Sequence, residues 1–295
     1  MITKLKITNS RGDEFEFSRL FRLTKGLDLS ALEASVNYST GVGAGSKYQN
    51  TKLENREFDI EFKMIRPKNA NEILMDDKRA NLYRVFNPEL NPMRVDIMMS
   101  NGKEYYLTAH LQSTPVMPPD YSNNNATGQR VLLQFLATDP YLYEKDARHL
   151  EIATWVKAFK FPLKIKQGGI KMGSRSQSLF INAINAGQNK TGMVISFKAN
   201  ATVVLPALIN VNTYEELRLN ITMAQGDVIE VSTYEDDMSI TLIKNNVSTN
   251  VFNAIDLYSH FLQLEPGDNL LRYEADAGVD NLEITLTYRA KSVGV

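Results

Sequence analysis

The sequence predicts a mainly-β protein of two domains with one amphipathic helix. Three observations lead to this prediction. The length of 295 residues exceeds the usual size of a single domain. Short stretches that alternate apolar and polar residues recur along the chain between turn signals, and only one stretch has helical periodicity. With 43% hydrophobic and 23% charged residues, such a chain can bury a core in each domain.

The N-terminal half reads as strands. Residues 56–65 show the clearest alternation, which places Phe58, Ile60, Phe62 and Met64 on one face. Between two strands, Asn101-Gly102 favours a tight primed turn, because these residues tolerate positive φ. Residues 38–48 contain three glycines and few large apolar side chains, so we expect a long loop or a hairpin tip. The strands expected in this half are residues 2–7, 14–17, 56–65, 94–99, 103–110 and 130–138.

The single helix is predicted over residues 70–86. Asn69 can cap its first turn, and Glu72 completes a pair that resembles a capping box. Asn87-Pro88 ends the helix, because proline disfavours helical geometry in the preceding residue. A period near 3.6 puts five apolar residues on one face, which should cover an open side of a sheet. These are Leu74, Met75, Leu82, Val85 and Phe86, with Asp76, Asp77, Asn81 and Arg84 on the opposite face.

A charged stretch at residues 144–149 marks the boundary between domains, which we place at 1–147 and 148–295. Beyond it, short strands recur with turn signals between them. This rhythm is typical of an antiparallel β-sandwich or jelly roll. The strands expected here are residues 179–182, 193–197, 208–211, 217–222, 227–232, 239–243 and 282–288.

Composition excludes several classes of function. The 33 basic and 34 acidic residues give a net charge of −1, without the basic excess typical of nucleic-acid binders. No cysteine is present, which removes disulfides and thiolate chemistry and fits a chain made in a reducing cytoplasm. The first ten residues lack the apolar core of a signal peptide, and no run of about 18 apolar residues predicts a membrane span.

No motif indicates catalysis, a cofactor or a metal site. The glycines of residues 41–45 lead into a strand rather than a helix, so a hairpin tip is favoured over a dinucleotide loop. Residues 187–191 lack the glycine that precedes the lysine of a P-loop, and a turn is favoured there. The acidic residues 235–237 lack the spacing of a calcium loop and read as a turn.

The remaining candidates are single side chains. His110, His149 and His260 are scattered, so structural roles are favoured over a triad or a metal site. Trp155, the one tryptophan, is favoured as a core or interface residue over a sugar platform. Paired carboxylates that cleave glycans are neither indicated nor excluded by the 34 acidic residues.

The order of several short motifs resembles that of the siphophage distal tail proteins, a family found in phages of Gram-positive bacteria. Each motif alone is ordinary turn or strand chemistry, and the resemblance rests on their order over nearly the whole chain. The motifs are Asn9-Ser-Arg-Gly12, Gly41 to Gly45, Arg56-Glu-Phe-Asp-Ile60, Phe86-Asn87-Pro88, Thr138-Asp139-Pro140-Tyr141, Asn185-Ala-Gly187, Gly226-Asp227-Val-Ile-Glu-Val231 and Leu264-Glu-Pro-Gly-Asp-Asn269.

This resemblance implies a tail-tube-like N-terminal belt domain, a β-sandwich or split barrel with one helix, that forms a hexameric ring around the DNA channel. It also implies a galectin-like C-terminal β-sandwich. The ring would join the tail tube protein to the tail-tip or tail-associated lysin protein at the distal end of the virion tail, and it would carry receptor-binding proteins or fibres. DNA would only pass through. No stretch is long enough for an inserted carbohydrate-binding module.

Two other functions stay open at the level of sequence: a lectin-like protein for host attachment, and a glycan-cleaving tail enzyme. For the ring, we expect residues 1–145 to hold the oligomer together. Tyrosines flank the glycine-rich segment, and tyrosine is favoured at protein contacts. The hypothesis is that this segment orders against a neighbouring subunit or tail component through Tyr38, Gly41, Gly43, Gly45 and Tyr48. The alternative is a disordered hairpin tip.

Overall fold

The chain folds into two compact units. The computed structural model describes residues 2–25, 27–29, 32–41, 43–67, 72–152, 155–157, 173–175 and 180–294. Unit 1 comprises Met1–Lys145 and Ser292–Val295, and unit 2 comprises Asp146–Lys291. The sequence suggested a simple division near residue 147. It did not predict that the last four residues return to the first unit.

Unit 1 is built on one antiparallel sheet with the strand order β2-β1-β7-β8-β10-β6-β3. The strands β8 and β10 are joined through only two paired positions, so the sheet curls into two halves around one core. The strands are β1 (Ile2–Thr8), β2 (Glu14–Glu16), β3 (Phe21–Leu23), β6 (Arg56–Ile65), β7 (Met93–Met99), β8 (Glu104–Leu111), β9 (Asn124–Asn125), β10 (Gly128–Ala137), β11 (Leu142–Glu144) and β26 (Lys291–Ser292).

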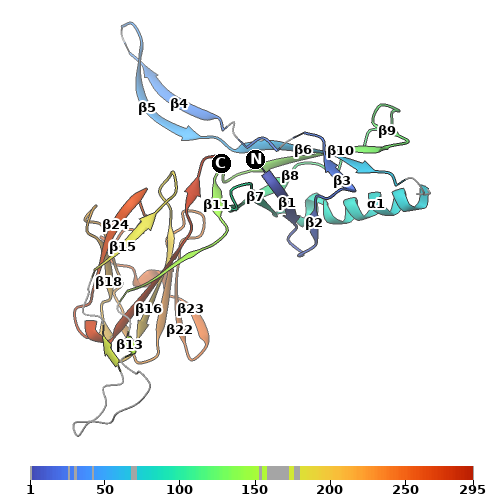
Figure 1. The fold of residues 1–295 in the computed structure, drawn as a ribbon. Helices are drawn as coiled ribbons and strands as arrows, with labels where there is room; N and C mark the ends of the chain where they lie inside the picture. Colours follow the sequence, from blue (N-terminus) through green and yellow to red (C-terminus); the bar gives the residue numbers. More distant parts are fainter. Residues whose placement is uncertain are drawn as a thin grey trace. The chain divides into compact units, whose positions relative to one another are not determined.

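The alternation predicted for β6 is confirmed. Phe58, Ile60, Phe62 and Met64 are all buried, and β10 pairs with β6 along its entire length. Figure 1 shows β3, β6 and β10 side by side. The apolar side chains of these strands therefore form one wall of the unit 1 core, while the alternate side chains form its outer face.

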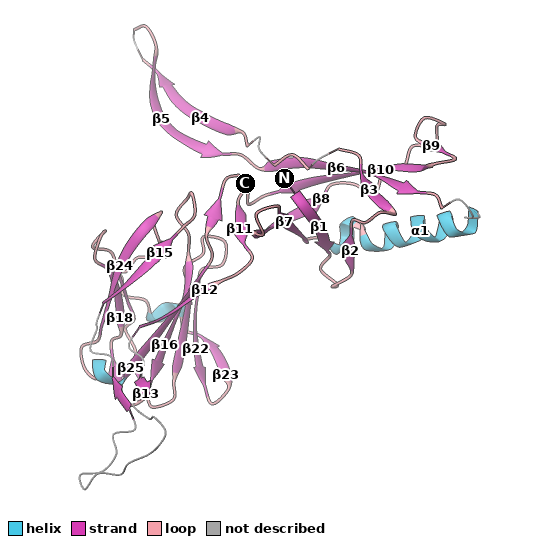
Figure 2. Ribbon diagram, viewed as in Figure 1, coloured by secondary structure: helices cyan, strands magenta, loops and turns pink. Residues whose placement is uncertain are grey.

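The predicted helix is α1 (Glu72–Val85), which lies along the sheet (Figure 2). The predicted phase is confirmed by four buried side chains, those of Met75, Leu82, Val85 and Phe86. The acidic residues Asp76 and Asp77 and their neighbours Asn81 and Arg84 are exposed. The capping residue Asn69, Ala70 and the side chain of Leu74 lie outside the described residues. A short 3-10 helix, η1 (Pro88–Leu90), follows, and Asn87 caps it by accepting from the Glu89 N–H.

The connection between β7 and β8 differs from the predicted primed turn. Gly102 has a φ of +80°, whereas Asn101 is not in the left-handed region. The Gly102 N–H donates to the Met99 carbonyl, and the Asn101 side chain accepts from the Lys103 N–H. Three residues separate Met99 from Lys103, whose carbonyl accepts from the Met99 N–H. A three-residue loop needs only one left-handed residue, whereas the predicted two-residue primed turn needs two.

Unit 2 is an antiparallel β-sandwich, as the sequence predicts, whereas its likeness to galectins stays a prediction. One sheet has the order β12-β25-β16-β21-β22-β23 and the other β15-β24-β18-β19, with a single core. The strands are β12 (Arg148–Ile152), β13 (Trp155–Lys157), β14 (Gly173–Arg175), β15 (Phe180–Asn185), β16 (Met193–Ala199), β17 (Val203–Val204), β18 (Ala207–Asn210), β19 (Glu216–Arg218), β20 (Thr222–Met223), β21 (Val228–Ser232), β22 (Ser239–Lys244), β23 (Val247–Asn250), β24 (Gly267–Glu274) and β25 (Leu282–Tyr288), with 3-10 turns η2 (Phe252–Ala254) and η3 (Val279–Asn281).

Buried amide side chains close the turns of unit 2. Asn269 is buried, and its amide group donates to the carbonyls of Ala183, Glu265 and Gly267. Asn185 is also buried and donates to the Leu264 carbonyl. Each side chain therefore satisfies backbone groups that a turn leaves unpaired inside the core.

We predict that Leu82→Asp destabilises unit 1 by about 3–5 kcal/mol, because it places an unpaired charge in the core. Leu82 is 0% exposed, whereas its neighbour Tyr83 is 46% exposed. Tyr83→Asp is therefore the matched control, and it should change stability by less than about 1 kcal/mol. Urea unfolding with hydrogen-exchange protection of β6 and β25 reports the two units separately. Equal effects of the two variants would contradict the assigned helical phase.

Candidate interaction site: the β4–β5 hairpin

Residues 34–53 form a long hairpin of unit 1, in agreement with the hairpin tip that was one of the two expectations for residues 38–48. The strand β4 (Ala34–Thr40) pairs with β5 (Ser46–Leu53), and no other strand pairs with either among the described residues. Figure 1 shows the hairpin extending beyond the unit 1 sheet. Its side chains are exposed or half-buried throughout, so both faces of the hairpin are open in the single chain.

A β-bulge in β5 determines which side chains of the hairpin share a face. The register shifts between Asn37 and Tyr38, so that Gln49 is an extra residue in β5 and Tyr48 pairs directly with Tyr38. Directly paired side chains share a face, and Val36 lies two positions before Tyr38 on that face. We call this the aromatic face of the hairpin.

The opposite face of the hairpin is polar. It carries the pair Asn37 and Asn50, whose side chains are hydrogen-bonded at 2.7 Å, together with Lys47 and Lys52. The hairpin is thus amphipathic, although neither face is covered. Tyr38 is 62% and Tyr48 61% exposed, which is unusual for large side chains in paired strands.

The predicted glycines lie at the tip of the hairpin. Gly41, Gly43 and Gly45 fall between the ends of β4 and β5, and Gly45 has a φ of +93°. A residue with a Cβ rarely adopts this φ, so glycine is required at that position of the turn. The structure therefore brings Tyr38 and Tyr48 together and places the glycines at the adjacent turn.

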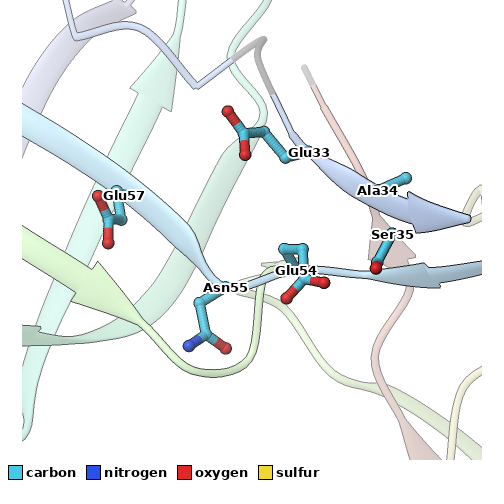
Figure 3. A pocket seen from close by; sticks show the side chains of 6 residues that line it. All are labelled: Glu33, Ala34, Ser35, Glu54, Asn55 and Glu57. Carbon is cyan, nitrogen blue, oxygen red and sulfur yellow. The ribbon is translucent and has the colours of Figure 1, made fainter.

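A hollow of about 640 Å³ lies at the root of the hairpin, lined by Glu33, Ala34, Ser35, Glu54, Asn55 and Glu57 (Figure 3). The Glu54 N–H donates to the Glu33 carbonyl at 2.9 Å and closes the hairpin there. No group of three or more His, Cys, Asp or Glu side chains in the described part of the chain is placed to hold a metal ion.

Arg56 anchors the root of the hairpin. It is 1% exposed at the start of β6, and its guanidinium donates to the carbonyls of Leu29, Pro140 (2.8 Å) and Val293 (2.6 Å). Burial lowers the pKa of Arg56 from its ordinary value. The guanidinium therefore fastens three chain segments that are distant in sequence around the point where the hairpin leaves the sheet.

Sequence reasoning did not find Arg56. The signal was present, since Arg56 stands two residues before Phe58 and so in phase with the buried positions of β6. A charged residue at such a position requires partners inside the protein.

The other residues considered from the sequence do not form a site. The imidazole of His149 contacts the Thr287 hydroxyl at 3.0 Å, His110 pairs with Leu136 within the unit 1 sheet, and His260 follows β23 in a loop of unit 2. Residues 235–237 lie in the turn between β21 and β22, as expected. The side chain of Trp155 lies outside the described residues. No helix in the described ranges is long and apolar enough to cross a membrane.

These features describe a mainly-β protein with an uncovered amphipathic hairpin. Residues 186–291 match the family model of the siphovirus-type tail component, C-terminal domain. This part of the chain resembles that family, and the resemblance to siphophage distal tail proteins is confirmed. Comparison with curated protein sequences gives no match.

Three solved structures share the fold over nearly the whole chain. The crystal structure of the SPP1 Dit protein, described as a paradigm of the hub adsorption apparatus of phages that infect Gram-positive bacteria, has a TM-score of 0.67 at 12% identity, covering 97% of this chain and 98% of that one. The phage P2 baseplate in its activated conformation with Ca gives 0.54 at 12% identity and covers 100% of both chains. The form with Sr gives 0.53 at 12% identity and covers 99% of both. At this identity the likeness shows the fold alone.

We predict that Arg56→Met destabilises unit 1 by about 3 kcal/mol or more, because three carbonyls lose a charged donor. Arg84→Met is the matched control, since Arg84 is exposed and forms a surface ion pair with Asp13 at 2.9 Å. Such pairs contribute at most about 1 kcal/mol. Urea unfolding of both variants measures the difference. If Arg56→Met costs no more than the control, the buried anchor does not carry the stability assigned to it.

Proposed function

We propose that this chain is a structural protein at the distal end of the tail of a long-tailed phage, where it forms a hexameric ring around the DNA channel. The ring joins the tail tube protein to the tail-tip protein. The family of residues 186–291 and the fold shared with hub and baseplate structures support a structural role in the tail. The ring, its six copies and its particular partners go beyond this structural role and are proposed here.

The uncovered hairpin is the observation that carries the proposal. An isolated two-stranded hairpin is marginally stable in water, and β4–β5 has no third strand or covering helix among the described residues. A neighbouring subunit that covers the aromatic face would bury Tyr38 and Tyr48. Tyrosine contributes strongly at the centre of protein interfaces, because it buries area while its hydroxyl keeps a hydrogen bond.

Closed ring symmetry suits such an element. In a ring each subunit presents one surface and receives a different one, so a hairpin on one side can dock on the next subunit around the circle. Unit 1 then forms the belt, and unit 2 is the part that receives the tail-tip protein or the receptor-binding proteins. In this arrangement the protein has no catalytic role.

One feature favours the lectin-like alternative. Tyr214 and Tyr258 of unit 2 are 86% and 83% exposed, and exposed aromatic rings can stack on sugars. Glycan binding by a protein that stays monomeric would support this alternative. Glycan binding by the ring would add a function to the hub rather than replace it.

The hairpin predicts a specific loss of assembly. Tyr38→Ser with Tyr48→Ser should raise the concentration needed for ring formation about 30-fold or more, equivalent to about 2 kcal/mol per subunit contact. Lys47→Ser with Lys52→Ser changes the polar face and should have little effect. Mass photometry and negative-stain imaging measure the ring, and thermal unfolding confirms that both variants fold. Unchanged rings in the tyrosine variant would remove the hairpin from the interface.

The second test concerns which unit holds the ring. Cutting the chain at Asp146 would also remove Ser292–Val295 from unit 1 and leave the Arg56 guanidinium without the Val293 carbonyl. We therefore replace residues 146–291 by a short Gly/Ser linker that keeps the last four residues. This variant should still form rings of the same subunit number by mass photometry. A variant that folds but stays monomeric at high concentration would show that unit 2 is needed.

A further inference from the structure

The outer face of strands β3, β6 and β10 in unit 1 has an unusual distribution of charge. Arg22 on β3 and Arg130 on β10 are both paired with Lys63 on the central strand β6. Directly paired residues place their side chains on the same face, so three cations stand next to one another across three strands. We call Arg22, Lys63 and Arg130 the cationic row. Figure 1 shows the three strands that carry it.

Within the chain, ion pairs among the described residues compensate one cation of the row, Arg130, which pairs with Glu61. Like charges directly opposite one another destabilise a sheet. Glu61 lies 3.4 Å from Arg130, and Lys63 donates to the Thr127 hydroxyl rather than to a carboxylate. Arg22 and Arg130 are exposed. The row is therefore an arrangement that an external anionic surface would stabilise.

The same face is acidic at its other end. Glu57, Asp59 and Glu61 follow one another at alternate positions of β6, and Glu57 and Asp59 are exposed. We call these three residues the acidic strip. Their paired positions on β10 are uncharged: Leu136, Gln134 and Leu132. A shallow hollow of about 310 Å³ lies beside the strip, and Glu57, Asp59, Lys25 and Asp28 are among its lining residues.

Glu61 forms an ion pair with Arg130 of the cationic row, whereas Glu57 and Asp59 continue the strip away from the row along β6. Lys63 and Glu57 are six positions apart on an extended strand, which is about 20 Å. The screening length at physiological ionic strength is only about 8 Å, so these two charges stabilise each other little. A surface that carries opposite charges at its two ends is complementary to a copy of itself in the antiparallel orientation.

We propose that this face is a self-complementary interface, on which two copies of the chain pair with the cationic row of each over the acidic strip of the other. The pairing is isologous, so each charged contact occurs twice. The half-buried Leu132 and Leu136 lie on this face and add apolar area to the contact. This inference does not rest on the ring, because it uses a different surface from the hairpin.

A second copy fits the face better than an acidic ligand does. Nucleic acid or an acidic protein would satisfy the cationic row, but the acidic strip would repel it. Only an occupant with both charges in the opposite order satisfies the entire face, and this chain supplies one.

The test uses charge reversal in the background Tyr38→Ser with Tyr48→Ser, so that the hairpin does not contribute to association. One variant carries Arg22→Glu and Arg130→Glu, and the other carries Glu57→Lys and Asp59→Lys. Sedimentation velocity over a range of concentrations measures the dissociation constant of the pair. We expect each variant to weaken self-pairing by on the order of tenfold or more, because like charges then meet.

Two combinations should restore the pairing. An equimolar mixture of the two variants should form a heteropair at least as tight as the parent pair, since one face is then acidic and the other basic. The variant with all four substitutions has both charges exchanged and should self-pair again. Rescue of this kind requires that the two regions meet each other. Raising NaCl from about 0.05 to about 0.5 M should weaken the parent pair.

Thermal unfolding of the charge-reversal variants shows whether they remain folded. The first variant loses the Arg130–Glu61 ion pair but places Lys63 between two carboxylates, so its thermal unfolding temperature should change little. A parent background that stays monomeric at all concentrations, or a mixture that does not pair, would overturn the proposal. Fluorescence anisotropy with a short DNA duplex tests the other occupant, and loss of DNA binding in the first variant without rescue in the mixture would assign the row to phosphate. Ring formation is scored separately in chains with an intact hairpin.

Discussion

The architecture of unit 1 depends on the hydrogen bonds that the buried Arg56 guanidinium donates. The guanidinium joins the segment before the hairpin, the end of β10 and the C-terminal residues through Leu29, Pro140 and Val293. A buried cation is costly, and here its charge is met by carbonyl dipoles of three segments rather than by one carboxylate. Each of these segments must therefore be in place for the others to be stable. These hydrogen bonds tie the start of β6, next to the hairpin root, to the other segments.

Most of unit 1 could be predicted because its apolar side chains follow the period of each element. The side chains predicted to face the core are the ones that are buried: Phe58, Ile60, Phe62 and Met64 on β6, and Leu82 on α1. The strands of the hairpin could not be predicted in this way. β4 and β5 are exposed on both sides, so no apolar alternation marks them, and only β-favouring residues such as Val36 and Tyr38 indicated strands.

The sequence predicted one part of the candidate site, the turn at the hairpin tip, but not the bulge or Arg56. Glycines flanked by tyrosines indicated a turn, and the structure places Tyr38 directly opposite Tyr48. The bulge at Gln49 could not be foreseen, because it depends on how the strands pair rather than on either strand alone. The phase of β6 marks Arg56 as a buried position, but its partners could not be predicted, because they are backbone carbonyls from distant parts of the chain.

Three of the motifs that carry the resemblance are turns held by one side chain. Asn9 accepts from the N–H groups of Arg11 and Asp13 and donates to the Val85 carbonyl at the end of α1. Asp139 and Asp227 accept from backbone N–H groups in the same way. Such turns fix where strands begin and leave the strand residues free to vary, provided that their burial pattern is kept.

The return of the last four residues to unit 1 has a consequence for durability. Unit 2 is an insertion held by two chain connections, one after Lys145 and one before Ser292. A protease that cuts one connection leaves unit 2 covalently joined through the other. After a cut near residue 146 that remaining link runs through Val293, whose carbonyl Arg56 holds. The chain would therefore keep unit 2 after a cut that would release a domain carried on a single linker.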